Sequence, residues 1–252
     1  MNKKIIILIF LTINSVNFIA AQRESSLQQA NEFYEKGKYA QAEEIYQNIL
    51  KTNETAPELY YNLGNACFKQ DKLAHAILNY ERALRLATNY ADARHNLAFA
   101  QQKVIDNIPD SNSFFLINWI KAVINLLNSN NWFYLSFVLF VLTLVFVFFF
   151  IFGKKHFLRK TSFYIAFLCL IISVITLVFS GIQKKYLLTR NAAIVMNGAV
   201  TVKSSPDKSG TDLFVLHEGA KVLVVGVLNS WVEIRLANGN AGWVEEQTIE
   251  RI

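Results

Sequence analysis

The N-terminal part of the chain alternates apolar and polar positions with the spacing of amphipathic helices, and the pattern repeats after 34 residues. Tyr46 and Tyr80 are 34 residues apart, and so are Leu63 and Leu97. The same spacing relates three small residues and three further pairs: Ala30, Gly64 and Ala98; Asn62 and Asn96; Ala42 and Ala76; Leu50 and Leu84. The pattern predicts helices over residues 25–36, 39–52, 57–70, 73–86 and 91–104, with turns at Gly37 and Asp71.

Two later stretches are apolar throughout. Residues 132–152 and 162–182 each contain no charged side chain over 21 positions. At about 1.5 Å per residue, each would cover roughly 30 Å as a helix, which is the thickness of the hydrocarbon core of a bilayer. The sequence therefore predicts two transmembrane helices joined by a loop over residues 153–161.

A shorter apolar stretch, residues 114–128, lies in the linker over residues 106–131. Its polar residues fall on one narrow stripe of a helix: Asn118, Lys121, Asn125 and Asn128. Fifteen residues reach only about 22 Å, which is too short to span a bilayer. Two interpretations stay open: an amphipathic helix in the membrane interface, or a cap over the end of the helical array.

Residues 192–252, which follow a linker at residues 183–191, change to short β-rich runs. Alternation is clearest from Trp231 to Arg235, and turn residues separate the runs. Asn238 and Gly239, between two such runs, are typical of a tight hairpin. The pattern predicts a small all-β barrel of about five or six strands.

Residues 1–21 have the pattern of a secretory signal. Lys3 and Lys4 precede an apolar run, and Ala20 with Ala21 forms a cleavage site before residue 22. Ile19, at the third position before the predicted cleavage site, is larger than the residue usually found at that position. An uncleaved anchor therefore stays open as the alternative. Either version carries the rest of the chain across the membrane.

The charge of the chain is concentrated near the apolar helices. The net charge is +6, and 53% of the residues are hydrophobic. Residues 22–105 carry 10 basic and 10 acidic side chains, whereas residues 111–191 carry 8 basic and no acidic ones. Cations beside transmembrane helices orient them and meet anionic lipid, whereas a nucleic-acid site would cluster cations on a soluble face. We therefore expect membrane lipid and no nucleic acid as a partner.

The short loop at residues 153–161 sets the predicted topology. It contains four cations: Lys154, Lys155, Arg159 and Lys160. The positive-inside rule places such a loop in the cytoplasm. We expect an inner-membrane protein with two transmembrane helices, whose N-terminal and C-terminal domains are both periplasmic.

No pattern of catalytic or metal-ligating residues stands out. Cys67 and Cys169 are expected to be free and buried, and the four histidines have no cysteine or carboxylate at ligand spacing. No glycine-rich phosphate loop and no nucleophile–base set occurs. We expect no metal, no cofactor and no catalytic site, and hence a protein that is not an enzyme.

The 34-residue period, with small residues where helices cross, resembles the tetratricopeptide repeat family. The resemblance implies an all-α solenoid of two and a half repeats over residues 22–105, closed by its last helix. It also implies a concave groove that binds proteins, lined by Asn31, Tyr34, Tyr61, Asn65, Phe68, Lys69, His95, Phe99 and Gln102. Asparagine side chains can hold an extended peptide backbone, and aromatic rings bury its side chains. The alternative is that these aromatic rings cover the chain's own linker helix.

The run from Val200 to Val244, with its Pro-containing loop, Trp231-Val232 and Gly242-Trp243-Val244, resembles bacterial Src-homology-3-like (SH3-like) domains. Some members of that family bind peptidoglycan peptides or other cell-wall ligands, and the resemblance makes Trp231 and Trp243 a candidate ligand site. The alternative is that both tryptophans help to close the barrel. The loop over residues 204–212 is the variable element expected to face a ligand.

The order of segments, with the run "IVMNGAVTVKSSPDKSGTDLFVLHEGAKV", resembles the BatE family of the Bat aerotolerance system of Bacteroidota. It implies a multi-domain membrane protein with a solenoid, a transmembrane hairpin and an SH3-like barrel. The implied partners are other Bat-system proteins, including membrane proteins with von Willebrand A domains, and the implied function is an inner-membrane scaffold linked to oxidative stress. A cell-wall sensor that binds peptidoglycan through the barrel, or a periplasmic chaperone, remains an alternative.

Overall fold

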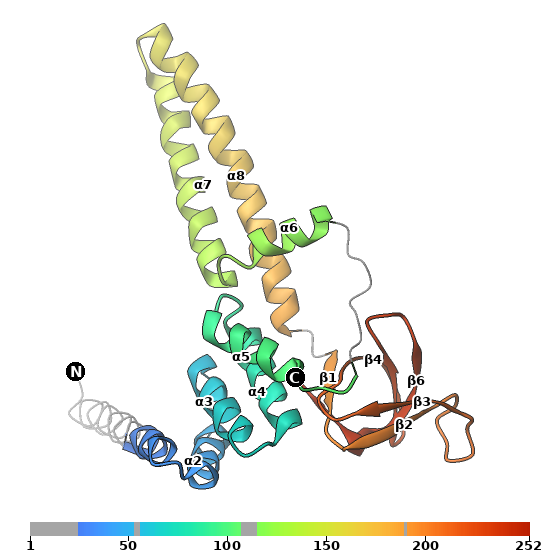
Figure 1. Cartoon of the computed structure of the whole chain (residues 1–252). Coiled ribbons are helices and arrows are strands. Elements are labelled where there is room, and N and C mark those ends of the chain that lie inside the picture. The colour runs from blue at the N-terminus through green and yellow to red at the C-terminus, as the bar shows by residue number, and fades with distance from the viewer. Residues whose placement is uncertain (1–24, 53–55, 107–114, 189–190) are drawn as a thin grey trace, which may run out of the picture. The chain divides into compact units, whose positions relative to one another are not determined.

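The computed structural model describes residues 25–52, 56–106, 115–188 and 191–252 (Figure 1). The predicted signal at residues 1–21 lies outside the described residues, as do residues 107–114 of the predicted linker. The chain divides into two compact units. The first takes its residues from Met1–Leu84, Tyr90–Pro109 and Asn191–Ile252, and the second takes its residues from Arg85–Asn89 and Asp110–Arg190.

The first unit begins with paired helices whose bounds agree closely with the prediction. A helix over residues 25–35 is followed by α2 (Tyr39–Lys51), α3 (Pro57–Phe68), α4 (Leu73–Leu86) and α5 (Ala91–Gln101). The turns within the two helix pairs fall at Gly37 and Asp71, both in the left-handed backbone region with φ of 73° and 57°. Left-handed residues of this kind end helices because they redirect the chain and satisfy the last carbonyl groups.

Small and aromatic residues interlock at the helix crossings. Tyr46 and Tyr80 are each 1% exposed, and Ala42 and Ala76 are fully buried. A Cβ atom at Gly64 would lie 2.7 Å from the ring of Tyr80, so only glycine fits where α3 crosses α4. The 34-residue period therefore places equivalent residues in equivalent packing positions, as a helical repeat requires.

The C-terminal part of the first unit is an antiparallel sheet. Its strands are β1 (Ala192–Val195), β2 (Ala199–Lys203), β3 (Asp212–His217), β4 (Lys221–Leu228), β5 (Trp231–Arg235), β6 (Ala241–Glu245) and β7 (Ile249–Arg251). They are hydrogen-bonded in the order β3-β2-β6-β5-β4-β1-β7. The predicted barrel is therefore not confirmed, because β3 and β7 remain as edges. We call residues 192–252 the β-domain.

The β-domain packs against the repeat helices through charged and apolar contacts. Lys221 Nζ donates to both carboxylate oxygens of Glu81, at 2.7 and 2.8 Å. Arg82 Nη2 donates to Glu250 Oε1 at 2.8 Å. Ile194 and Ile252 belong to the same buried apolar cluster as helix residues such as Ile77. Ile252 thus helps to cover the repeat helices, a contact that the sequence did not predict.

The second unit contains α6 (Phe115–Ile124), α7 (Ser129–Phe152) and α8 (His156–Leu188). Among the described residues, α7 and the segment His156–Lys185 of α8 are long and apolar enough to cross a membrane. Both helices extend beyond the predicted spans, and only residues 153–155 connect them. Arg159 and Lys160, predicted in the loop, therefore lie in the first turns of α8.

Hydroxyl groups join α7 to α8 along one seam. Ser136 Oγ donates to the carbonyl oxygen of Ser173, and Ser173 Oγ donates to that of Ser136, both at 2.9 Å. Ser129 and Ser180 make the same reciprocal pair, at 3.0 and 2.9 Å. Small side chains let two apolar helices approach closely, and the reciprocal bonds satisfy each hydroxyl group away from water.

Candidate protein-binding groove

Two neighbouring pockets lie along the repeat helices, with volumes of about 260 and 310 Å³. The first is lined by Asn31, Tyr34, Glu35, Tyr46, Asn62 and Asn65. The second is lined by Tyr34, Tyr61, Asn65, Phe68, Lys69, Tyr80, Asn96 and Phe99. Because Tyr34 and Asn65 line both, the pockets are adjacent, and we call the two together the groove.

The groove repeats one polar pair at the period of the helices. Tyr46 Oη donates to Asn31 Oδ1 at 2.7 Å, and Tyr80 Oη donates to Asn65 Oδ1 at 2.8 Å. Each tyrosine comes from the second helix of a pair and reaches the asparagine of the first helix. Since the amide oxygen is engaged, the amide nitrogen of each asparagine is left to point elsewhere.

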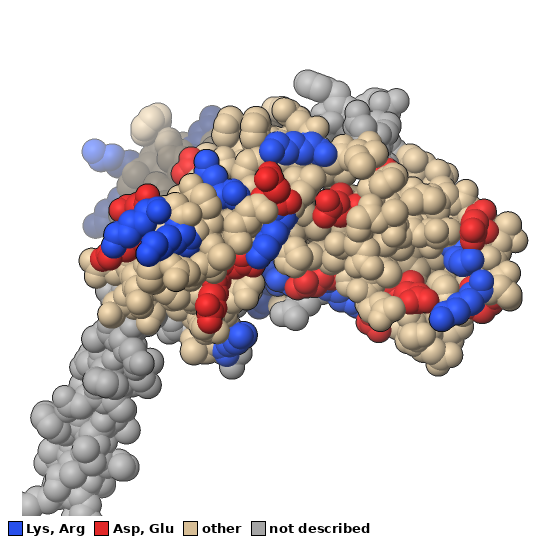
Figure 2. Space-filling model, turned by 60° about the horizontal axis from the view of Figure 1, so that its bottom comes forward, with Lys and Arg blue, Asp and Glu red and all other residues tan. Residues whose placement is uncertain are grey.

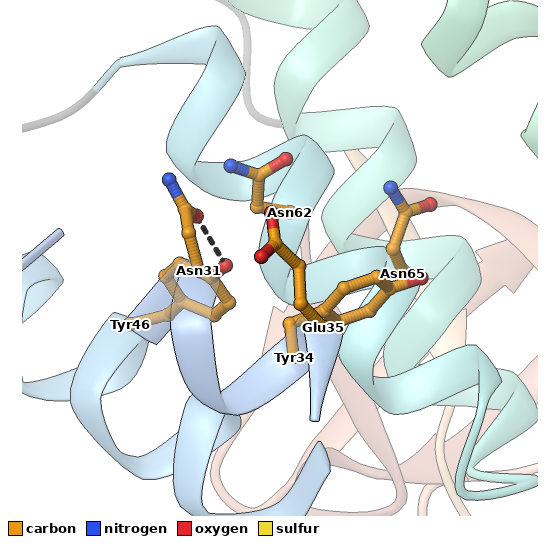
Figure 3. Close-up of a pocket in the computed structure, with 6 residues that line it drawn as sticks. All are labelled: Asn31, Tyr34, Glu35, Tyr46, Asn62 and Asn65. Carbon is orange, nitrogen blue, oxygen red and sulfur yellow. Dashed lines mark hydrogen bonds between the residues drawn. The ribbon is translucent and has the colours of Figure 1, made fainter. Parts of the chain in front are cut away.

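The amide groups form a row. In Figure 3, the amide ends of Asn31, Asn62 and Asn65 point to the same side of the helices that carry them. Asn96 extends the row, because its Nδ2 donates to Asn65 Oδ1 at 2.8 Å and to Tyr61 Oη at 3.3 Å. The tyrosines thus act as positioning residues that turn successive amide N–H donors toward the groove.

Burial keeps the positioning tyrosines protonated. Desolvation, with smaller contributions from Tyr34 and Glu35, raises the pKa of Tyr46 to about 12. Desolvation is also the largest cause of the raised pKa of Tyr80. A protonated phenol donates its hydroxyl hydrogen, so both Asn–Tyr bonds keep their direction across the physiological pH range.

The charge around the groove is mixed. The lining residues of the two pockets include one acid, Glu35, and one base, Lys69. Lys103 lies close by, with its Nζ 4.6 Å from the centroid of the Phe68 ring. On the face of the molecule that Figure 2 shows, Lys and Arg are interspersed with Asp and Glu. That face has no broad area of one sign of the kind that nucleic acid would attract.

The structure brings together seven of the nine predicted groove residues. Asn31, Tyr34, Tyr61, Asn65, Phe68, Lys69 and Phe99 line the two pockets. His95 and Gln102 are exposed and line neither pocket. The groove also contains residues that were not predicted to line it: Glu35, Tyr46, Asn62, Tyr80 and Asn96. The 34-residue spacing within Tyr46–Tyr80 and Asn62–Asn96 was the available signal, because equivalent positions of a repeat line the same surface.

The two candidate tryptophans lie on one face of the β-domain. Trp231 and Trp243 are half-buried, while the adjacent Val232 and Val244 are fully buried. Because successive strand residues point to opposite faces, both tryptophans face away from the core that contains these valines. Neither lines the groove described above. Whether they bind a ligand stays a prediction.

Comparisons with known proteins agree with the two modules of the first unit. A family model described as Tetratricopeptide repeat matches residues 27–91. A family model described as Bacterial SH3 domain matches residues 198–250. A comparison with curated proteins found no match. Together, the two family matches suggest that the chain carries modules that bind proteins or peptidoglycan.

Proposed function

We propose that this protein is a membrane-anchored scaffold whose groove holds an extended segment of a partner polypeptide. The row of oriented asparagine amides carries the proposal. An extended polypeptide presents carbonyl acceptors at regular intervals, and the amide N–H groups of Asn31 and Asn65 match such acceptors chemically. The amide nitrogen of Asn96 donates within the groove, to Asn65 and Tyr61, and so holds Asn65 in place. Binding of this kind recognises the backbone of the partner and needs no catalytic group. We therefore propose that the protein is not an enzyme.

The aromatic side chains of the groove would supply apolar contacts to the bound segment. Phe68 and Phe99 have ring centroids 5.7 Å apart, and Phe99 is 52% exposed. Exposed aromatic rings on a rigid scaffold are typical anchors of protein interfaces. Since Lys69 is the single basic residue among those lining the pockets, we favour an internal segment of the partner over a terminal carboxylate.

The two long apolar helices would anchor the scaffold in the inner membrane. With the connection 153–155 and the start of α8 in the cytoplasm, the repeats and the β-domain both lie in the periplasm. The exposed Trp119 and Ile120 of α6 favour a helix that lies in the membrane interface. The order of modules supports a Bat-type assembly with von Willebrand A-domain membrane proteins, in which two weak modules on one anchor gain affinity by avidity.

The test is an isosteric change in the groove. Asn65→Asp keeps the oxygen that accepts from Tyr80 and Asn96 but replaces the free amide donor with a carboxylate acceptor. Asn48→Asp makes the same change in charge on the exposed face of α2. Crosslinking in intact cells, followed by detergent extraction, pull-down and mass spectrometry, compares the partners of both variants with those of the wild type.

We expect a few stoichiometric membrane-protein partners for the wild type and Asn48→Asp, and loss of most of them for Asn65→Asp. One misplaced buried or interfacial hydrogen bond costs about 1–3 kcal/mol, so the loss is expected to be about 5-fold to 150-fold in affinity. Equal partners in all three samples would refute the groove as the binding site.

The bacterial SH3 match favours a second candidate function, binding of peptidoglycan by the β-domain. The outward-facing Trp231 and Trp243 would then contact the cell wall. Sedimentation of the detergent-solubilised full chain with purified cell walls separates the two functions. A chain that pellets with the walls, and that stays in the supernatant after Trp231→Ala/Trp243→Ala, would establish the cell-wall function, whereas the scaffold function predicts no pelleting.

A further inference from the structure

The turn between α7 and α8 contains a cleft that the groove does not explain. It has a volume of about 430 Å³ and is lined by Phe150, His156, Arg159, Lys160, Phe163 and Tyr164. The lining of the cleft therefore combines cationic and aromatic side chains. All six residues belong to the second unit and lie next to the short connection at residues 153–155.

The cationic side of the cleft is held in place. Arg159 Nε donates to the backbone carbonyl oxygen of Phe150 at 3.2 Å. The guanidinium carbon of Arg159 lies 5.6 Å from the centroid of the Phe150 ring. The rings of Phe150 and Phe163 are themselves 5.6 Å apart. The contact through Nε leaves the other guanidinium nitrogens of Arg159 to bind a phosphate in the fork geometry that arginine favours.

The cations here have no acidic counterpart nearby in the chain. Residues 111–191 contain no Asp or Glu at all, whereas four Lys or Arg residues fall between Lys154 and Lys160. The first turn of α8 adds a helix N-terminus, whose dipole also favours an anion. An anion from outside the chain would therefore balance the positive charge of the site.

We propose that this cleft binds the headgroup of an anionic phospholipid. The inference rests on the proposed membrane insertion of α7 and α8. The apolar run of α7 ends at Phe152, so the cations that follow it stand at the level of the headgroups. Arg159 and Lys160 contact the phosphate, while Phe150, Phe163 and Tyr164 contact the glycerol and the first methylene groups. A free phosphate would use only the cationic side chains of the cleft.

Native mass spectrometry of the purified full-length protein in detergent tests the site. Phosphatidylglycerol and phosphatidylcholine with identical acyl chains are added separately, and bound lipids are counted. We expect the wild type to retain the anionic lipid more strongly, by about tenfold or more, because each Lys or Arg near a lipid surface contributes roughly fivefold in affinity. Equal retention of both lipids would overturn the proposal without any variant.

Two variants with equal loss of charge locate the binding. Arg159→Gln/Lys160→Gln changes the cleft, whereas Lys154→Gln/Lys155→Gln removes two cations from the same turn but not from the cleft lining. We expect the preference for phosphatidylglycerol to vanish in the first variant and to persist in the second. Equal loss in both would mean diffuse attraction and no defined site. Binding of inorganic phosphate by the wild type as tightly as of phosphatidylglycerol would reject a lipid headgroup as the ligand.

Failure of the membrane anchor is a separate outcome. Alkaline carbonate extraction of cell membranes reports whether the wild-type chain is integral. A chain released by carbonate would refute both the anchor and the lipid site. A chain that stays in the pellet but shows no preference for anionic lipid would refute the lipid site alone.

Discussion

Gly64 shows how one residue determines the approach of two helices. Its ideal Cβ position lies 2.7 Å from two ring carbons of Tyr80 and 3.3 Å from the carbonyl oxygen of Ala76. Tyr80 is fixed by its own bond to Asn65, so the ring has little room to withdraw. A packing constraint at one residue is therefore linked directly to the geometry of the groove.

Gly64→Ala is expected to lower the free energy of unfolding by about 1–3 kcal/mol, because the added methyl group overpacks the crossing of α3 and α4. Thermal unfolding of the full-length protein in detergent measures the change. Gly198→Ala is the control, since nothing lies within 4 Å of its Cβ position. Equal unfolding temperatures for the two variants would contradict the packing argument.

Tyr46 gives the stability of the repeats a dependence on alkaline pH. Burial raises its pKa to about 12, whereas an exposed tyrosine in the unfolded chain ionises near pH 10. The folded state therefore holds the proton more tightly. The stabilisation is complete below about pH 10 and is lost as the pH rises toward 12.

Unfolding followed between pH 9 and 12, with tyrosinate absorbance as the readout of ionisation, measures this dependence in the wild type and in Tyr46→Phe. The variant is expected to be less stable at neutral pH, because it loses the hydrogen bond to Asn31, but to lose less stability on going to high pH. Parallel pH profiles would show that Tyr46 is not the titrating group.

At the scale of elements, the contact between α4 and β4 is a charge pair with one buried member. Glu81 is 9% exposed and Lys221 is 38% exposed as side chains. Removing the lysine would leave a carboxylate away from water, which costs more than the intact pair contributes. The pair therefore specifies how the β-domain docks on the repeats.

Lys221→Met is expected to lower the free energy of unfolding by about 1–3 kcal/mol, less than for a fully buried pair because the lysine is partly solvated. Glu81→Leu/Lys221→Met removes both charges and should recover most of the loss. Lys36→Met breaks a pair in which both side chains are about 60% exposed, and should change little. Thermal unfolding compares the three; a Lys221→Met effect no larger than that of Lys36→Met would exclude the docking role.

The helices and the central strands, including β5 and its hairpin with β6, could be predicted closely from the sequence, but the open sheet, its strand order and its contacts with the helices could not. The apolar period of α2 to α5 is local, so it is visible in one stretch of chain. By contrast, segments that are distant in the sequence meet where β1 pairs with β4 and β7, and where Ile252 packs beside helix residues. Such contacts leave no local pattern in the sequence. Likewise, Tyr46 and Tyr80 have dual roles: the repeat spacing revealed their packing, while their bonds to asparagines became visible only in three dimensions.

For the whole molecule, the proposed hairpin topology predicts that the C-terminus and the turn between α7 and α8 lie on opposite sides of the membrane. Alkaline phosphatase, which is active only in the periplasm, is expected to be active when fused after Ile252 and inactive when inserted between Lys154 and Lys155. Green fluorescent protein at the same sites should give the opposite pattern. The expectation follows from the positive-inside rule, by which cations beside transmembrane helices favour the cytoplasmic side. Activity of the phosphatase at both sites would contradict the hairpin topology.

The seam between α7 and α8 has a mechanical consequence. Ser129, Ser136 and Thr143 are spaced by seven residues on one helix, and Ala166, Ser173 and Ser180 are spaced by seven on the other. If one helix slid along the other, the small residues of the two helices would face each other again only after a shift of seven residues, or about 10 Å. The connection at residues 153–155 is too short to allow that step, since three residues extend at most about 11 Å and already bridge the two helix ends. The hairpin therefore has a single favoured register, and we expect its two helices to move together and not to slide past one another.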